Sequence, residues 1–278
     1  MEIKLDESTL GGKKVMVGTP MYGGQCYHNY VYGMLEFQKL CLEYQVPMVY
    51  TVMANSSLIH AARNNIVEEF LKSDCTHLIF LDADMGFKGI ELLAMLACNK
   101  DIIGGAYPRK VINWDNVRMA ILNNPEITVN DLQMATGAFP LLLEDPTAEY
   151  QSDEIMKVTG TGTGMMIIER SVFSKFREAY PEFTYNPDND CEYKFDPNAD
   201  ESTWKTAYFS TGITTVENNG ITTKVDMGED YRFCHFCRLL GIEVWYAPFT
   251  NTTHMGSYEF KGSIGAMARL VNGINIRG

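Results

Sequence analysis

The chain has 278 residues, of which 46% are hydrophobic and 21% charged, so it can form one large domain or two small ones around a substantial core. This composition excludes a disordered tail, a collagen-like repeat and a small disulfide-dense protein. Because 35 acidic residues oppose 23 basic ones, the formal charge is −12, which disfavours nucleic acid and anionic membranes as partners and means that a phosphorylated ligand would need a cation.

The cysteines and the apolar segments indicate where such a chain resides. The seven cysteines are odd in number and irregularly spaced, which predicts a reduced, cytoplasmic protein. No apolar run approaches the roughly 20 residues of a membrane-spanning helix. The acidic start MEIKLDES is not typical of a secretory signal. We therefore expect a soluble protein without a membrane span.

The first hundred residues alternate between two hydrophobic periods, one typical of buried strands and one typical of amphipathic helices. Strands are expected over 13–18, 47–54, 77–81 and 101–105, and helices over 31–42, 58–72 and 89–98. Strands that are apolar on both faces and alternate with helices predict a mostly parallel, Rossmann-like sheet covered on each side. The fold class is therefore α/β.

The second half is less regular. Residues 107–151 show weak periodicity and predict an irregular excursion with a helix or two. Strands follow over 155–159, 165–168 and 244–247, with helices from Ser171 and over 228–240. The acid-rich stretch 182–204 predicts a solvated surface insertion. No repeat or linker divides the chain, so 1–278 is predicted to be a single domain.

The sharpest local feature is the Asp82-x-Asp84 pair directly after the strand HLIFL. On an extended chain both carboxylates project to one side, at the edge of the sheet where α/β proteins bind ligands. At an effective dielectric of about 20 and a separation of about 5 Å, such a like pair costs about 3 kcal/mol. A divalent cation, Mg²⁺ or Mn²⁺, would offset that cost. The alternative is a solvated turn, since Asp-x-Asp is common by chance.

Two further features could contribute chemistry. Glu229 and Asp230 open a helix, where acids also serve simply as caps. His254 follows the last strand and, taken alone, is more often a surface residue. Cys234 and Cys237 lack a second pair to complete a zinc site, so we expect them to be packing residues. Gly160-Thr161-Gly162-Thr163-Gly164 leads into a strand and is therefore not a dinucleotide-binding fingerprint.

Several segments in a fixed order resemble a known family. The sequence resembles GT-A-fold glycosyltransferases, most closely the single-domain glycosyltransferase-like proteins of phages and large DNA viruses, over residues 13–262. The segments that carry the resemblance are VMVGTPMYGG, SLIHAARNNIVEEFL, THLIFLDADM, DIIGGAYPRK, GTGMMIIERSVF, GEDYRFC and THMGSYEFKG. The resemblance implies a GT-A-like sheet with a nucleotide-sugar half over about 13–110, a smaller acceptor and catalytic half over about 150–262, and, for a viral protein, the host-cell cytoplasm.

The resemblance also implies roles for individual residues. Asp82, Asp84 and His254 would be the metal ligands, holding Mn²⁺ or Mg²⁺. Asp82 and Arg63 would also contact the nucleotide-sugar. The loop after the first strand, with Thr19, Pro20 and Tyr22, would hold the nucleotide base. Asp230 would be the general base on the acceptor side, with Glu229 as the other candidate. The stretch 182–225 matches no acceptor pocket.

These expectations combine into a metal-dependent glycosyltransferase that moves a sugar from a nucleotide-sugar, first of all a UDP-sugar, to a hydroxyl of a glycan or glycoprotein acceptor, with inversion. A retaining mechanism without an enzymic base is an alternative. A sugar nucleotidyltransferase is a second alternative, but it usually has a basic Gly-rich loop after the first strand, and no Lys or Arg lies between Lys14 and Lys39. A non-catalytic carbohydrate-binding protein on the same fold is the third.

Overall fold

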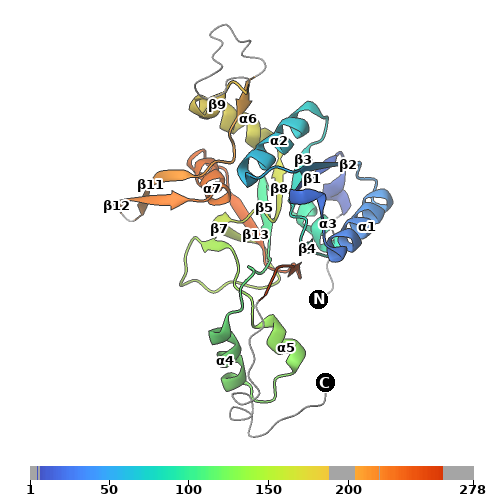
Figure 1. Ribbon diagram of the computed structural model, residues 1–278, viewed down its shortest axis with the longest axis vertical. Coiled ribbons are helices and arrows are strands. Elements are labelled where there is room, and N and C mark those ends of the chain that lie inside the picture. The colour runs from blue at the N-terminus through green and yellow to red at the C-terminus, as the bar shows by residue number, and fades with distance from the viewer. Residues whose placement is uncertain (1–4, 6, 188–203, 219, 259–278) are drawn as a thin grey trace.

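The computed structural model describes residues 5, 7–187, 204–218 and 220–258. Its centre is an eight-stranded sheet with strand order β2-β1-β3-β8-β5-β13-β7-β6 (Figure 1). The strands are β1 (Val15–Met21), β2 (Met48–Ala54), β3 (His77–Leu81), β5 (Ile102–Gly105), β6 (Leu141–Leu143), β7 (Met156–Thr161), β8 (Met165–Glu169) and β13 (Val244–Ala247). All strands expected from the sequence are present in this sheet, with ends that differ by a few residues.

Strand direction confirms the expected class. The pairs β1–β2, β1–β3 and β13–β5 are parallel, whereas β8 and β7 run antiparallel to both of their neighbours. Six of the eight strands therefore point the same way, and the sheet is mixed but mostly parallel. Strand β8, from the later part of the chain, lies between β3 and β5 of the earlier part. The sheet is the mostly parallel α/β arrangement that the sequence predicts.

Helices cover both faces of the sheet because its strands are apolar on both sides. Leu78 and Phe80 of β3 pack into one core with α2 (Ile59–Lys72), α6 (Arg170–Ala179) and α7 (Glu229–Leu239). Ile79 and Leu81 of the same strand pack into a second core with α1 (His28–Glu43) and α3 (Gly89–Ala97). The two cores explain why β3 is buried over its whole length.

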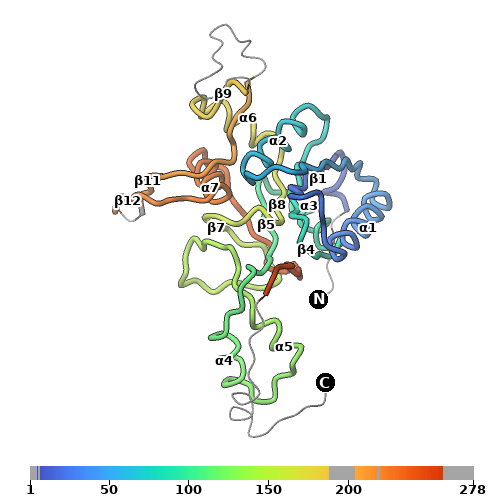
Figure 2. The backbone as a smooth tube through the Cα atoms, in the orientation of Figure 1, coloured from blue at the N-terminus to red at the C-terminus, as the bar shows by residue number. Residues whose placement is uncertain are grey.

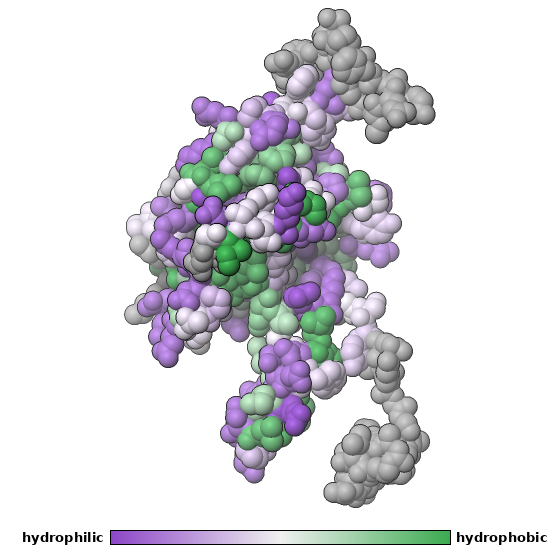
Figure 3. Space-filling view, turned by 90° about the vertical axis from the view of Figure 1, so that its left-hand side faces the viewer, coloured by the Kyte–Doolittle hydropathy of each residue, from purple (hydrophilic) through white to green (hydrophobic). Residues whose placement is uncertain are grey.

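The excursion between β5 and β7 contains α4 (Trp114–Asn123) and α5 (Val129–Met134), so the expectation of a helix or two is confirmed. The tube in Figure 2 shows this segment extending away from the sheet. Neither helix has a buried residue, and Trp114, Leu122, Val129 and Met134 are exposed. In Figure 3 the same segment stands apart below the main body, with hydrophobic side chains among polar ones.

Smaller elements complete the described part of the chain. The hairpin of β11 (Gly212–Asn218) and β12 (Ile221–Met227) was not expected from the sequence. Short pairs join β9 (Thr184–Tyr185) to β10 (Lys205–Thr206), and β4 (Met85–Gly86) to β14 (Thr253–His254). Most of the acid-rich stretch 182–204 lies outside the described residues. Cys234 and Cys237 are buried in the core, which confirms them as packing residues.

Candidate active site

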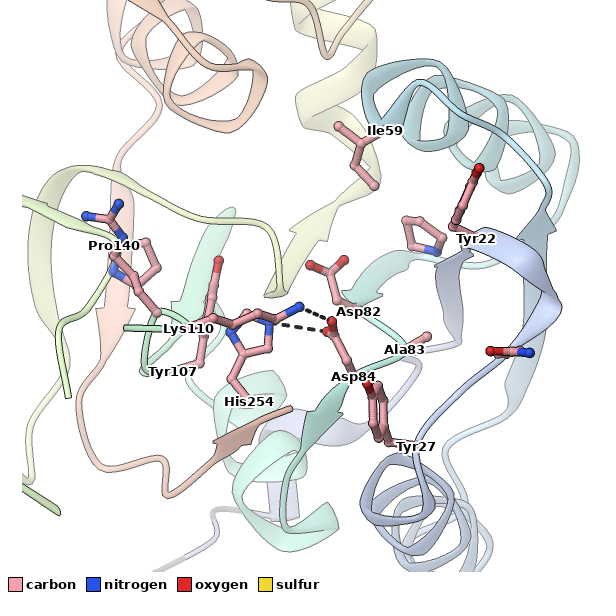
Figure 4. A pocket seen from close by; sticks show the side chains of 13 residues that line it. Tyr22, Tyr27, Ile59, Asp82, Ala83, Asp84, Tyr107, Lys110, Pro140 and His254 are labelled. Atoms are coloured by element: carbon pink, nitrogen blue, oxygen red, sulfur yellow. Dashed lines mark hydrogen bonds and ion pairs between the residues drawn. The ribbon is translucent and has the colours of Figure 1, made fainter. Parts of the chain in front are cut away.

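The carboxyl ends of β1, β3, β5 and β13 meet at one edge of the sheet because these four strands run in the same direction. A cleft of about 570 Å³ opens there (Figure 4). It is lined by residues that follow these strands and by two neighbouring segments, namely Pro20, Tyr22, Gln25, Tyr27, Ile59, Asp82, Ala83, Asp84, Tyr107, Arg109, Lys110, Pro140 and His254. The edge of the sheet therefore gathers residues from 20 to 254 into one site.

Asp82 and Asp84 both lie in this cleft, but they do not project to one side as expected for an extended chain. Strand β3 ends at Leu81, and the Met85 N–H donates to the Asp82 carbonyl (3.1 Å), which closes a turn. The Asp82 side chain accepts a hydrogen bond from Arg63. The Asp84 side chain is directed toward His254 and Lys110 (Figure 4). Because of this turn the side chains do not alternate as they would along a strand, and each carboxylate has a cationic partner of its own.

Arg63 links the Asp82 turn to the start of α7. Its guanidinium donates to Asp82 Oδ1 at 3.2 Å and to Glu229 Oε1 at 2.6 Å, and only 5% of its side chain is exposed. Arg63 is not among the residues that line the cleft. A contact between Arg63 and a donor stays a prediction, whereas its bridging role is a finding of the structure.

Asp84 is held from two sides. His254 Nε2 lies 3.2 Å from Asp84 Oδ1, and Lys110 Nζ forms an ion pair with Asp84 Oδ2. Burial alone would raise the pKa of Asp84, but the hydrogen bonds from His254 and Lys110 outweigh it and hold the pKa below its usual value. Asp84 is therefore a carboxylate that is kept ionised.

The second nitrogen of His254 fixes its tautomer. Nδ1 lies 2.8 Å from the carbonyl oxygen of Pro108, which can only accept, so Nδ1 carries the proton. Nε2 can therefore donate to Asp84 Oδ1 only when the imidazole carries a second proton, whereas in a neutral imidazole Nε2 presents a lone pair to Oδ1 and two acceptors face each other. A proton or a metal ion between them removes this conflict. A backbone carbonyl on the far nitrogen is also the usual support of a metal-binding histidine.

The spacing of these two atoms fits a divalent ion. Neighbouring ligands of an octahedral ion with bonds of about 2.1 Å lie about 3 Å apart, close to the 3.2 Å observed between His254 Nε2 and Asp84 Oδ1. A carboxylate and an imidazole are ligands that Mn²⁺ accepts. Among the described residues no group of three or more His, Cys, Asp and Glu side chains is gathered for a metal. Asp82 as a further ligand stays a prediction.

A short strand pair places His254 beside Asp84. β14 pairs with β4, which directly follows the Asp82–Asp84 turn, and the Met255 N–H donates to the Asp84 carbonyl at 2.9 Å. A β-carbon at Gly86 would overlap the Thr253 hydroxyl and the Asn29 amide, which are hydrogen-bonded to each other at 2.8 Å. Glycine at this position is therefore required for the close approach of β14.

Tyr107 packs edge-on against His254, with ring centroids 5.7 Å apart, and its hydroxyl lies near Asp230. Its hydroxyl accepts the Gly164 N–H at 3.2 Å, and a side chain at Gly162 would overlap this hydroxyl and lie 3.3 Å from Asp230 Oδ2. The pKa of Tyr107 is raised by burial first, and then by the charges of Asp82 and Asp230. Gly162 and Gly164 thus leave room for the Tyr107 ring and hydroxyl.

Asp230 lies in the first turn of α7, and its Oδ1 accepts the Tyr231 N–H at 2.8 Å. Burial raises the pKa of Asp230 above its usual value, and the neighbouring Glu229 raises it further. A raised pKa makes the carboxylate a stronger base. Glu229 differs because its Oε1 is committed to Arg63. Asp230 does not line the cleft itself, and its carboxylate lies next to Gly162 and the Tyr107 hydroxyl.

Thr19 and Pro20 were expected in a loop after the first strand, but they lie in β1 itself, which runs to Met21, and only Tyr22 follows the strand. Pro20 and Tyr22 line the cleft, and Tyr22 is 76% exposed. Thr19 is fully buried, with its hydroxyl 2.6 Å from that of Tyr30, and does not line the cleft. Tyr107, Arg109 and Lys110 also line the cleft, although no sequence motif assigned them to a site. Adjacent bases just after a strand end are the signal that could have identified the last two.

No protein-family model matches the chain, and no curated protein matches it in sequence. Solved structures with a similar fold include A197 from STIV, with 13% identity and a TM-score of 0.45 over 88% of this chain and 86% of that one. GalNAc-T7, crystallised with UDP, GalNAc and Mn²⁺, is 10% identical with a TM-score of 0.41, over 89% of this chain but only 44% of that one.

A third similar structure is a glycosyltransferase involved in the glycosylation of the major capsid of PBCV-1, with 10% identity and a TM-score of 0.29 over 64% of this chain and 71% of that one. Because their TM-scores are below 0.5, these three structures support no conclusion about the activity of this chain. An inference about activity has to be drawn from the residues of the cleft. Among the described residues no helix has both the length and the apolarity needed to cross a bilayer.

Proposed function

We propose that the protein is a metal-dependent glycosyltransferase that transfers a sugar from a nucleotide-sugar, first of all a UDP-sugar, to a hydroxyl of a glycan or glycoprotein. The observation that carries this proposal is the contact of His254 with Asp84 across 170 positions of sequence, with Nε2 of the imidazole facing a carboxylate oxygen. The half-buried carboxyl of Asp230, next to Gly162 and the Tyr107 hydroxyl, would supply the second requirement, a base.

Asp84 and His254 would hold the divalent ion, Mn²⁺ or Mg²⁺, and Asp82 is the further ligand that the resemblance implies. When bound, such an ion supplies Lewis-acid stabilisation of the negative charge that develops on the departing phosphate. The chain's own residues orient this site: the Pro108 carbonyl fixes the imidazole, and Arg63 fixes the Asp82 turn.

The nucleotide would lie along the strand edge, between the loop after β1 and the bases that follow β5. The exposed ring of Tyr22 offers a surface for a nucleobase, and Arg109 and Lys110 line the same cleft. These two cations matter because the chain carries a formal charge of −12, which would otherwise repel a diphosphate.

Asp230 would accept the proton of the acceptor hydroxyl. In a single inverting displacement, the acceptor oxygen forms a bond to the anomeric carbon, the bond from that carbon to the diphosphate breaks, and the hydroxyl proton moves to the Asp230 carboxylate. The raised pKa of Asp230 favours this transfer. Glu229 is less suited because its ion pair with Arg63 would have to break first.

The test is release of nucleoside diphosphate. The purified chain with Mn²⁺ is incubated with a panel of UDP- and GDP-sugars and a broad mixture of glycan and glycoprotein acceptors. We expect at least one donor to yield diphosphate, and Asp84→Ala to abolish both this release and Mn²⁺-dependent UDP binding in calorimetry. Absence of release from every donor, or unchanged calorimetry for Asp84→Ala, would contradict the proposal.

A further inference from the structure

Lys110 forms an ion pair with Asp84, the carboxylate on which the proposed metal site depends. Its Nζ pairs with Asp84 Oδ2 while His254 Nε2 lies against Oδ1, so both oxygens of Asp84 already have a partner. Figure 4 shows Lys110 and His254 approaching the Asp84 carboxylate together, each joined to it by a dashed line. A divalent cation therefore meets a carboxylate that an ammonium group has already neutralised.

The ammonium group and a divalent ion cannot share this carboxylate without repulsion, because both are positive and the site is half-buried. The Lys110 side chain is 42% exposed, and its stem lies against Gly256, where an added β-carbon would be 2.8 Å from Cδ. A partly exposed lysine has the freedom to turn its Nζ, since an ion pair of this kind is worth only a small free energy.

The cleft offers Lys110 a second role once it leaves Asp84. Lys110 and Arg109 are the Lys and Arg side chains among its described lining residues. A donor diphosphate in this cleft would be the nearest anion of high charge, and lysine binds phosphate through its charged hydrogen bonds. Lys110 can therefore neutralise Asp84 in the metal-free protein and bind the diphosphate once the metal and the nucleotide are bound.

We propose that Lys110 is an exchangeable counter-ion, which neutralises Asp84 in the metal-free protein, yields this carboxylate to a divalent cation, and then binds the diphosphate of the nucleotide. The inference rests on the proposed function because it takes Asp84 as a metal ligand. It assigns to Lys110 two effects of opposite sign: competition with the metal and cooperation with the nucleotide.

Two titrations of Lys110→Met test this pair of effects. In calorimetry with Mn²⁺ alone, the variant should bind the metal about two- to fivefold more tightly than the wild type, the factor that corresponds to a partly exposed ion pair. In a titration with UDP at saturating Mn²⁺, it should bind UDP about tenfold more weakly, because a charged hydrogen bond is lost. Lys110→Arg keeps the charge, so its affinities for Mn²⁺ and for UDP should lie between those of the wild type and those of Lys110→Met.

Lys14→Met is the matched control. Lys14 forms the same kind of ion pair, with Asp74, its side chain is 44% exposed, and it precedes β1 at the opposite edge of the sheet. Its loss should change neither titration. A variant that merely misfolds would weaken both ligands, so opposite changes cannot come from damage to the fold.

Unchanged or weaker Mn²⁺ binding by Lys110→Met overturns the inference, and so does unchanged UDP binding. If the wild type binds Mn²⁺ and UDP and releases diphosphate while Lys110→Met behaves identically, the inference fails and the proposed function stands. If the wild type binds no Mn²⁺ in calorimetry, both fail.

Discussion

At the scale of single residues, the site depends on how each acid is partnered. Asp84 faces His254 and Lys110, Glu229 is paired with Arg63, and Asp230 is half-buried next to Glu229. These surroundings shift the pKa values of the acids in opposite directions: the pKa of Asp84 is held low, whereas that of Asp230 is raised. A site that separates its carboxyls in this way can use one as a ligand and another as a base.

Asp230→Asn should lower kcat by about 10²- to 10⁴-fold, the usual contribution of a general base. Binding of UDP with Mn²⁺ should stay close to that of the wild type, because Asp230 does not line the nucleotide cleft. Initial-rate kinetics and calorimetry measure the two quantities separately. A loss of less than about threefold in kcat would remove Asp230 from the role of base and favour a mechanism without one.

The acidic limb of the rate profile should report Asp230. A base acts when it is ionised, so kcat falls as the pH drops through its pKa, and a raised pKa moves this fall to higher pH than for an ordinary carboxyl. Glu229→Gln removes the charge that contributes to the rise, so the limb should shift to lower pH. Profiles of kcat against pH for the two proteins check the sign. A limb that stays in place or moves upward would be inconsistent with Asp230.

At the scale of elements, short connections between segments far apart in the chain assemble the site. The pair β4–β14 joins the turn after β3 to the segment after β13, and Arg63 joins α2 to the start of α7. Neither connection is part of the central sheet. The geometry of the site is therefore sensitive to changes that leave the sheet intact.

Gly86→Ala should weaken Mn²⁺ binding several-fold without altering any proposed ligand. Its β-carbon would overlap Thr253 and Asn29, so β14 must shift and carry His254 away from Asp84. Gly11→Ala is a suitable control, because the nearest atom to its β-carbon is 3.8 Å away. Calorimetry with Mn²⁺ compares both variants with the wild type. Equal affinities would show that β14 does not position His254.

Arg63→Met should lower the free energy of unfolding by about 3 kcal/mol, since removing one partner of a buried ion pair leaves the other charges uncompensated. Here the uncompensated groups are Asp82 and Glu229. The exposed Arg118 provides the control, and Arg118→Met should stay within about 0.5 kcal/mol of the wild type. Urea denaturation measures both. Similar unfolding free energies for the two variants would deny Arg63 its bridging role.

At the scale of the whole molecule, charge and architecture act together. A protein with a formal charge of −12 presents a mostly parallel sheet whose strand ends gather one cleft, and that cleft carries Arg109 and Lys110. A strongly acidic protein should bind an anionic nucleotide poorly unless cations screen it. The metal and the nucleotide are therefore expected to bind as a pair.

UDP alone or Mn²⁺ alone, at roughly 100 times its dissociation constant, should raise the melting temperature by about 5 °C, because a ligand of the native state stabilises it. The joint shift should exceed the sum of the two separate shifts. Differential scanning fluorimetry measures all three, and Asp84→Ala should lose the joint excess. Simply additive shifts in the wild type would argue against a shared site.

The sequence alone predicts the α/β class of the fold and most of its strands. Buried strands are apolar on both faces and helices on one, so their periods are written into local composition, as in 77–81 and 58–72. It also identified Asp84, His254 and Asp230 as candidates. The expectation that Asp82 and Asp84 project to one side was wrong. A single hydrogen bond closes the turn after Leu81, and such a bond leaves no periodic pattern in the sequence.

Which of the candidate site residues contact one another could be seen only in the tertiary structure. The contact of His254 with Asp84, the capture of Glu229 by Arg63 and the position of Lys110 on Asp84 each join segments separated by 26 to 170 positions. The hairpin β11–β12 likewise escaped detection. Strand order and short pairs such as β4–β14 bring such segments together, and they are set by the packing of the whole chain rather than by any local pattern.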